Sequence, residues 1–476
     1  MKNLKFFSPH DFDMGNTGYT DQYNHNYTLK TQRKHAMSLK RNKYIVVAIG
    51  LLFQMSLKVE AMPIDTTLAK QYFQEFQLSC NQDNGKLWGV SFYGPMLIAD
   101  PETHSVVANQ GDMNGNLKQS GDVYVGTLPK TQGIADTATF WSGKKWLMLR
   151  WPLNEDKYER ARLMIHESFH RIQEEIGFPL FNSASDHLDT YEGRIWLQLE
   201  WRALIKALSN KGDERRKAIK DALVFRIHRR NQFSDTDSLE NRLEMNEGLA
   251  EYTGIKLCGI PDYELTSYVV KKFDQAKEWE TFIRSFPYLS GPAYGVLLDE
   301  AGVAWRKNLK ATDDLGKLLQ NAHLIEIPNS IKSEAEARAF EYDFETLQEI
   351  EIERKQKLQK LMAEYQERFI TGPVLIIPIS QKGQGFSITF KPTNLFPLGT
   401  LGTVYATMKI ATSWGELTVT DGAVLTPDWN KVYVPAPVNP NVKHLTGKGW
   451  ELSLDENWKL VSAEREGDFT LEKVEK

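Results

Sequence analysis

Two histidines and a glutamate in the stretch Leu-Met-Ile-His-Glu-Ser-Phe-His, residues 163–170, have the types and the spacing of a metal-dependent hydrolytic site. His166 and His170 are four positions apart, so on a helix both imidazoles face one side and can bind the same metal ion. Glu167 projects beside that position, where its carboxylate can take a proton from a water molecule. The alternative interpretation is two partly buried histidines next to a surface glutamate.

A third metal ligand is expected in the stretch Leu-Glu-Met-Asn-Glu-Gly-Leu-Ala-Glu-Tyr, residues 243–252. A catalytic zinc ion needs three protein ligands and one open position. Glu247 and Glu251 share one face of a helix because they are four residues apart. We expect Glu247 to bind the metal and Glu251 to accept a hydrogen bond from a ligating imidazole, which fixes the tautomer of that ring.

Together the two stretches resemble the gluzincin class of zinc metallopeptidases, in which H-E-x-x-H is followed by N-E-x-x-x-[DE] on a second helix. The resemblance covers about residues 158–256 and implies Zn²⁺ bound by His166, His170 and Glu247, with Glu167 as the general base. It departs from the class in two respects. The 76 residues from 171 to 246 are a far longer separation than in thermolysin-like or M1-like enzymes, and the G-x-M-E-N stretch with which M1 aminopeptidases bind a substrate amino terminus is absent. The subfamily therefore stays open.

The elements that must position these residues are two helices. Apolar residues recur at helical spacing over 158–176, and Gly177 followed by Pro179 predicts where this first helix ends. Helical patterns continue over 186–258, which accounts for much of the separation between the two motifs.

The remaining regions predict the fold class. Short β-type runs between turn residues over 87–153 predict a small, mostly antiparallel sheet before the first motif helix. A charged stretch over 331–366 predicts a connecting helix, and later β-type runs predict a small β domain, a sandwich or a barrel, over 367–476. We therefore expect an α+β protein whose zincin-like catalytic domain occupies 62–330.

Two further segments bear on how a substrate is bound and activated. The run 145–151 is a candidate edge strand that aligns an extended peptide by strand addition, or an ordinary core strand. Tyr288 and Tyr294 lie in a segment rich in glycine and proline, and each is a candidate donor to the oxyanion that forms during amide hydrolysis. Packing in the core is the alternative for each tyrosine, and Arg284 is a weaker candidate donor.

The composition is that of a globular chain long enough for two or three domains. It has 476 residues, of which 41% are hydrophobic and 25% charged. The formal net charge of −4 offers no electrostatic case for nucleic-acid binding. Two cysteines, Cys80 and Cys258, are too few for a disulfide scaffold or a cysteine zinc site, and they are either bonded to each other or free.

Residues 1–61 have the pattern of a leader and a signal peptide. A basic stretch at 40–43 precedes an apolar run from Tyr44 to Leu57 that is too short and too interrupted for a stable membrane span. Small residues before the expected cut predict cleavage after Ala61 and export to the periplasm or the extracellular space, with an uncleaved anchor as the alternative.

These patterns lead us to expect an exported zinc metallopeptidase that acts on a peptide or protein substrate. Zinc polarises the scissile carbonyl and lowers the pKa of a water molecule, and Glu167 transfers the proton to the leaving amine. Two alternatives are a non-catalytic binding protein on a zincin scaffold and a zinc hydrolase of a non-peptide amide or ester. The presence of Glu167 argues against the first alternative, because this residue is not needed to hold the metal.

Overall fold

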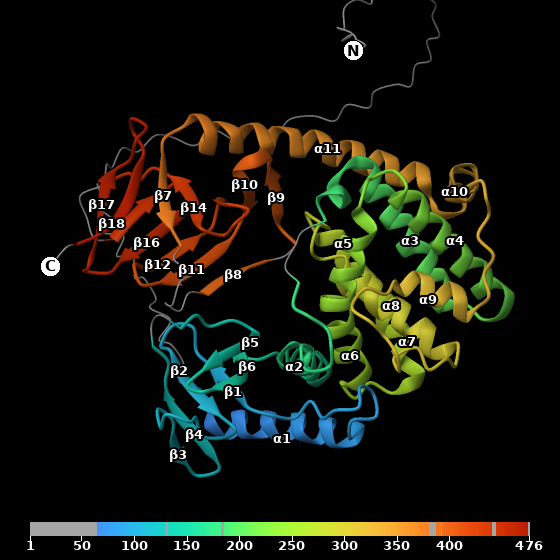
Figure 1. The fold of residues 1–476 in the computed structure, drawn as a ribbon, viewed down its shortest axis with the longest axis horizontal. Coiled ribbons are helices and arrows are strands. Elements are labelled where there is room, and N and C mark those ends of the chain that lie inside the picture. The colour runs from blue at the N-terminus through green and yellow to red at the C-terminus, as the bar shows by residue number, and fades with distance from the viewer. Residues whose placement is uncertain are drawn as a thin grey trace, which may run out of the picture. The chain divides into compact units, whose positions relative to one another are not determined.

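A helix and a six-stranded sheet begin the part of the chain that the structure describes (Figure 1). This computed structural model describes residues 64–129, 132–181, 185–379, 387–391, 393–439 and 444–474. The expected leader and signal peptide, residues 1–61, lie outside them. The chain from Glu60 to Lys476 is one compact unit, and its helices and sheets make the protein α+β, as predicted.

The first sheet is small and mostly antiparallel, as predicted. It follows helix α1 (Thr66–Asp83), and its strand order is β3-β4-β2-β1-β6-β5. Only β1 and β6 pair in parallel, and every other neighbouring pair is antiparallel. The strands are β1 (Met96–Ala99), β2 (Ser105–Ala108), β3 (Lys118–Ser120), β4 (Val123–Thr127), β5 (Thr137–Trp141) and β6 (Lys144–Arg150).

Strand β6, which contains most of the candidate edge strand at 145–151, is an internal strand. It pairs with β1 on one side and with β5 on the other. Trp146 and Met148 pack into a core on one face of the sheet, whereas Leu147 and Leu149 pack into the core on the other face. A strand that is buried on both faces has a continuous apolar run, which explains the composition of this segment. The edge-strand interpretation is therefore wrong for β6, and the edge strands of the sheet are β3 and β5.

The middle of the chain is helical and begins with α2, the helix of the first motif. Asp156 caps α2 by accepting hydrogen bonds from the backbone N–H groups of Tyr158 and Glu159. The helix begins as predicted but ends at Ile172, four residues before the predicted end at Ile176, and a turn leads to Gly177. The bounds are α2 (Lys157–Ile172), η1 (Asp186–Asp189), α3 (Tyr191–Ser209), α4 (Gly212–Arg230), α5 (Thr236–Leu243), η2 (Glu244–Gly248), α6 (Leu249–Leu257), α7 (Asp262–Lys272), η3 (Phe273–Glu278), α8 (Pro287–Glu300) and α9 (Leu315–Ala322).

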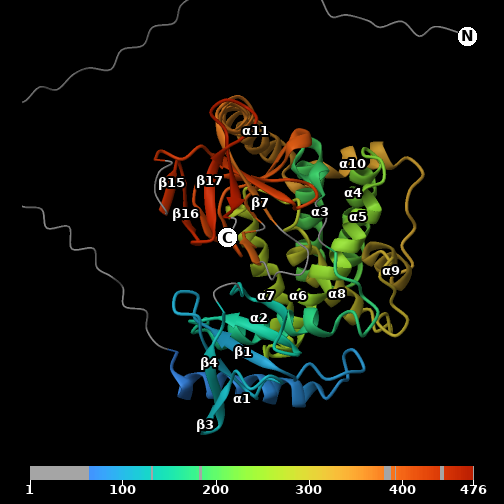
Figure 2. The same cartoon turned by 60° about the vertical axis from the view of Figure 1, so that its left-hand side comes forward.

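Helix α2 lies between the first sheet and α6. It contacts β5 and β6 on one side and α6 on the other. Figure 1 shows α2 between these elements, and in Figure 2 it lies between β1 of the same sheet and α6. The histidine motif is therefore carried by an element that is packed on two sides, which limits its freedom to move.

The predicted connecting helix at 331–366 is interrupted. Helix α10 (Ile331–Ala339) leads through η4 (Phe340–Tyr342) to Asp343, whose φ of 53° is left-handed, and the chain then forms α11 (Phe344–Gln366) and η5 (Glu367–Thr371). A left-handed residue cannot continue a right-handed helix, so it separates the two segments.

The last region is a β-sandwich, one of the two architectures expected from the sequence. Two sheets of order β17-β18-β7-β14-β13-β10-β9 and β15-β16-β12-β11-β8 share one core, in which Trp414 is almost fully buried. The strands are β7 (Val374–Pro378), β8 (Ser387–Phe390), β9 (Leu395–Leu398), β10 (Gly402–Tyr405), β11 (Met408–Thr412), β12 (Gly415–Val419), β13 (Ala423–Leu425), β14 (Lys431–Pro435), β15 (His444–Gly447), β16 (Trp450–Leu454), β17 (Trp458–Ser462) and β18 (Phe469–Lys473), with η6 (Gly399–Leu401) after β9.

Cys80 and Cys258 are free and buried, so they are not bonded to each other. Within the described residues, no helix combines the length and the apolar character that a membrane span requires.

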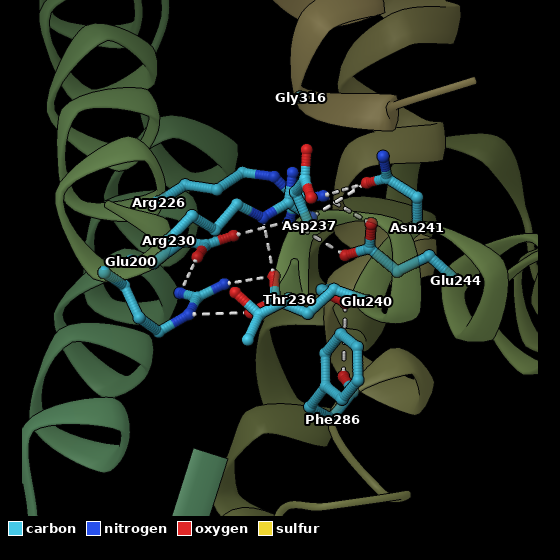
Figure 3. Close-up of polar contacts among 12 residues, drawn as sticks. Glu200, Arg226, Arg230, Thr236, Asp237, Glu240, Asn241, Glu244, Phe286 and Gly316 are labelled. Atoms are coloured by element: carbon cyan, nitrogen blue, oxygen red, sulfur yellow. Dashed lines mark hydrogen bonds and ion pairs between the residues drawn. The ribbon is translucent and has the colours of Figure 1, made fainter. Parts of the chain in front are cut away.

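A buried cluster of charged side chains joins α3, α4, α5 and η2 (Figure 3). Arg226 donates to Glu200 at 3.2 Å and to Glu244 at 2.5 Å, and Arg229 donates to Glu240 at 2.7 Å and also to Glu200. All five side chains are at most 2% exposed. Removing such charges from water costs several kcal/mol per ion, which their mutual attraction offsets only while every partner is present.

Replacing Arg226 with methionine should destabilise the protein by about 3–5 kcal/mol, because Glu200 and Glu244 lose a buried guanidinium. The matched control is Lys217→Met, whose partner Glu341 is exposed and whose ion pair is worth at most about 1 kcal/mol. Denaturant unfolding followed by circular dichroism measures both losses. Equal losses in the two variants would show that the buried cluster contributes no more to the free energy of unfolding than an exposed ion pair does.

Candidate metal centre

Helix α2 presents both motif histidines to one side, as the spacing predicted. The Nε2 atoms of His166 and His170 are 3.2 Å apart, and the two rings lie nearly at right angles with centroids 4.9 Å apart. His166 is buried and His170 is partly exposed. Each side chain therefore directs its own Nε2 atom toward one common point.

Glu247 reaches this point from a distorted helical turn. Helices α5 and α6 are joined through η2, a π-helical turn that contains Glu247. A π-turn inserts extra backbone into a helix and is frequent at functional sites. Gly248 in the same turn packs against Gly291 of α8 so closely that a Cβ atom built on Gly291 would lie 2.3 Å from the Gly248 Cα. The absence of side chains at these two positions lets α8 approach η2.

The three candidate ligand atoms form a triangle that suits a zinc ion. Glu247 Oε2 is 3.5 Å from His166 Nε2 and 3.3 Å from His170 Nε2, and the two nitrogens are 3.2 Å apart. Zinc binds imidazole nitrogen and carboxylate oxygen at about 2.0–2.1 Å, so two ligands of a tetrahedron are roughly 3.4 Å apart. Within the described residues, this is the one group of three His, Cys, Asp or Glu side chains that satisfies the proximity required of metal ligands.

Glu251 holds His166 in the orientation that metal binding requires. Its Oε2 atom is 3.0 Å from His166 Nδ1, and it accepts from Arg162 at 2.6 Å, while Lys272 Nζ lies 3.1 Å from Oε1. Burial works against ionisation, but Arg162 and Lys272 hold the pKa of Glu251 well below its ordinary value. An ionised carboxylate accepts the Nδ1 proton of His166 and leaves the Nε2 lone pair free for a metal.

A second chain of hydrogen bonds, which the sequence analysis missed, orients His170. Its Nδ1 is 2.6 Å from the amide oxygen of Gln173, which can only accept, so the proton is on Nδ1. Gln173 donates to Asn246 at 2.7 Å, and Asn246 donates to Glu247 Oε1 at 3.0 Å. The second histidine and the third ligand are thus linked through two amides. Gln173 stands three residues after His170 in the sequence, which was the available signal.

The electrostatics of the triangle favour a cation. Burial opposes the charged form of His166, yet hydrogen bonds to Glu247 and Glu251 raise its pKa to about 10. Burial likewise opposes ionisation of Glu247, but His170 and His166 hold the pKa of Glu247 well below its ordinary value. The surroundings therefore stabilise positive charge between these groups, and a divalent metal ion supplies it.

The triangle lies in a cleft with a volume of about 420 Å³ that Glu167 and Tyr288 also line. Within the described residues, no hydrogen bond or ion pair reaches the Glu167 carboxylate, and burial raises its pKa to about 7. Tyr288 stacks on the His166 ring at 5.7 Å and donates its hydroxyl proton to Glu247 Oε2 at 3.0 Å. A carboxylate with this pKa and a phenol donor are therefore next to the candidate ligands.

Tyr294, the other candidate donor to the oxyanion, is not in the cleft. It is fully buried in α8, and its hydroxyl donates to Glu200 of the buried ion cluster at 2.8 Å. Tyr294 is six residues beyond Tyr288 in the same helix, a separation that turns the two side chains toward different surroundings. The expectation that Tyr294 stabilises an oxyanion is therefore wrong.

The β-sandwich forms part of the cleft wall, which the sequence did not indicate. Ile388, Thr389 and Phe390 of β8 line the cleft together with Trp429, opposite residues of the other region such as Thr137 and Thr139 of β5. Both β5 and β8 are edge strands of their sheets. The cleft is thus bounded by two sheet edges that are far apart in the sequence.

Comparisons of the chain with protein-family models, with curated proteins and with solved structures gave no match.

Three single substitutions should give an ordered series in zinc affinity. Glu167→Gln should bind zinc about as tightly as the wild type, because its carboxylate is not one of the three candidate ligand groups. Glu251→Gln should weaken binding by about 10–100-fold, the usual effect of losing a partner of a ligating imidazole. Glu247→Gln should be weakest, since an amide replaces an anionic ligand. Chelator competition on the folded variants measures the order, and zinc held by Glu247→Gln at wild-type affinity would rule out Glu247 as the third ligand.

Proposed function

We propose that this protein is a zinc-dependent peptidase whose metal is bound by His166, His170 and Glu247. The observation that carries the proposal is the triangle of ligand atoms, with sides of 3.2, 3.3 and 3.5 Å. Its edges have the length expected for three corners of a zinc tetrahedron. Zinc bound there would polarise a carbonyl and lower the pKa of a water molecule.

Glu167 is the proposed general base. It lines the same cleft as the three ligands, and within the described residues its carboxylate accepts no hydrogen bond. A base with a pKa near 7 can accept a proton from water and return it to the leaving amine at neutral pH. Amide hydrolysis requires both transfers, and one carboxylate beside the reacting atoms can perform them.

Tyr288 is the proposed donor to the oxyanion. Its hydroxyl contacts Glu247 at 3.0 Å, so it is within a hydrogen bond of the ligand group and can turn toward a substrate oxygen in the cleft. A preorganised donor of this kind stabilises the charge that develops in the transition state.

A peptide substrate is favoured by the edge strand β5, which lines the cleft through Thr137 and Thr139. An unpaired strand edge can bind an extended peptide through backbone hydrogen bonds. We accordingly propose a zincin-like arrangement, in which α2 carries the histidines beneath the edge of a mixed sheet and export through the signal peptide brings the enzyme to substrates outside the cytoplasm.

Two alternative functions fit the site less well than a peptidase. A non-catalytic binding protein has no use for an unpaired carboxylate in a cleft, which costs stability, so Glu167 argues against it. A zinc hydrolase of a small amide or ester would need no strand edge, and β5 favours the peptidase over it.

Replacing Glu167 with glutamine should abolish most peptide hydrolysis and leave bound zinc in place. General base catalysis is worth about 10²–10⁴-fold, so turnover should fall by at least that factor. Rates on a panel of quenched fluorescent peptides, measured together with zinc content, test the proposal. Full activity in Glu167→Gln would disprove the assigned mechanism, and the absence of any chelator-sensitive hydrolysis by the wild type would disprove the function.

The two tyrosines make a matched pair for the oxyanion assignment. Tyr288→Phe should lower kcat by about 10²–10³-fold, the effect of removing one oxyanion donor, with zinc still bound. Tyr294→Phe should lower stability, because buried Glu200 loses a donor, and should leave kcat of the folded protein close to the wild-type value. Steady-state kinetics and denaturant unfolding separate the two effects, and a larger fall in kcat for Tyr294→Phe would reverse the assignment.

A further inference from the structure

Arg284 is the one lysine or arginine among the described residues that line the cleft. It lies in the turn before α8, four residues ahead of Tyr288, and its side chain is half-buried. The acidic residues that line the same cleft are Asp136, Glu167 and Glu247. Asp136 is paired with Arg150 at 2.6 Å, and Glu247 faces the two histidines.

Two aromatic rings of the β-sandwich hold the Arg284 guanidinium. Its central carbon is 5.6 Å from the ring centroid of Phe390 and 5.8 Å from that of Trp429. A guanidinium near an aromatic face is attracted by the ring and loses conformational freedom, while its charge is not neutralised. The rings therefore orient the group and leave its charge available.

The guanidinium has no acceptor for its donors in the described part of the chain. Arginine has five N–H donors in a planar fork, and no described residue accepts a hydrogen bond from Arg284 or lies within ion-pair distance of it. Burial raises the pKa of Asp186 and the positive charge of Arg284 partly offsets this effect, but the two side chains form no ion pair. A half-buried, oriented and unsatisfied guanidinium is matched by a bidentate carboxylate.

We propose that Arg284 binds a carboxylate of the substrate, so that the enzyme prefers peptides with a negative charge near the cleaved bond. This proposal rests on the proposed peptidase function and names its substrate class. The carboxylate has two possible sources, an Asp or Glu side chain or the C-terminal carboxylate of the peptide. The proposal also gives the β-sandwich a role, because Phe390 and Trp429 keep the guanidinium in position.

The test uses the full chain loaded with zinc and matched peptides. One set is alanine-rich, amidated at the C-terminus and quenched, with a single Glu at successive positions and a Gln twin for each peptide. The second pair differs only in a free or an amidated C-terminus. We expect kcat/KM to be about 10–100-fold higher for one carboxylate peptide than for its neutral twin, the usual gain from a hydrogen-bonded ion pair. The set that shows the ratio identifies the source of the carboxylate.

Arg284→Gln should reduce that ratio to about 1, and Arg284→Lys should restore part of it, since an ammonium keeps the charge without the fork. The matched control is Arg242→Gln. Arg242 also lies over an aromatic ring, 3.8 Å from the centroid of Phe181, but it is exposed and does not line the cleft. It should keep the wild-type ratio. Equal rates for all twins in the wild type, or an unchanged ratio in Arg284→Gln, would overturn the proposal.

Calorimetry separates this proposal from the peptidase function. The Glu167→Gln variant should bind the carboxylate peptide about 10–100-fold more tightly than the neutral twin, and adding Arg284→Gln should remove the difference. If the wild type hydrolyses no peptide but this difference is found, the carboxylate site stands and the function fails. Equal binding of the twins would overturn the carboxylate site even if the peptides are hydrolysed.

Discussion

The contact of the Glu247 carboxylate with the imidazoles of His166 and His170 is the interaction on which the rest of the site depends. A carboxylate and two imidazoles converge within 3.5 Å of one another in a largely buried place, where an unpaired charge would be costly. Hydrogen bonds and ion pairs to neighbouring side chains hold each of these groups in position. Glu251 and its partners Arg162 and Lys272 hold the first histidine, and the two amides of Gln173 and Asn246 join the second histidine to Glu247.

The turn η2 connects this site with the buried ion cluster of Figure 3. Glu244 begins the turn and accepts from Arg226, whereas Glu247, three residues later, faces the histidines. One short segment therefore carries two carboxylates with different partners. Because breaking a buried charge pair costs far more than breaking an exposed one, the cluster resists any shift of η2 relative to α3 and α4. The cluster therefore restrains the turn that also carries Glu247.

The cleft above the site combines two regions with separate cores. The first sheet contributes its edge strand β5, and the sandwich contributes β8 and Trp429, which hold Arg284. Access to the candidate metal centre is thus governed partly by residues more than a hundred positions beyond the last ligand. The proposed preference for a carboxylate depends on both regions, because Arg284 supplies the positive charge and the two aromatic rings of the sandwich hold its guanidinium.

The sequence by itself determined the parts of the protein that depend on local spacing. Two histidines four residues apart must share a helix face, Glu247 and Glu251 follow the same rule, and alternating or helical apolar patterns predicted the α+β class, the first sheet and the last β region. Only the tertiary structure decided that β5, not β6, is the edge strand beside the cleft and that Tyr288, not Tyr294, faces it. It also decided that Asn246 and the sandwich complete the site. The physical reason is that these outcomes depend on which surfaces become buried against each other, and the spacing of residues within one helix or strand does not specify which other element packs against it.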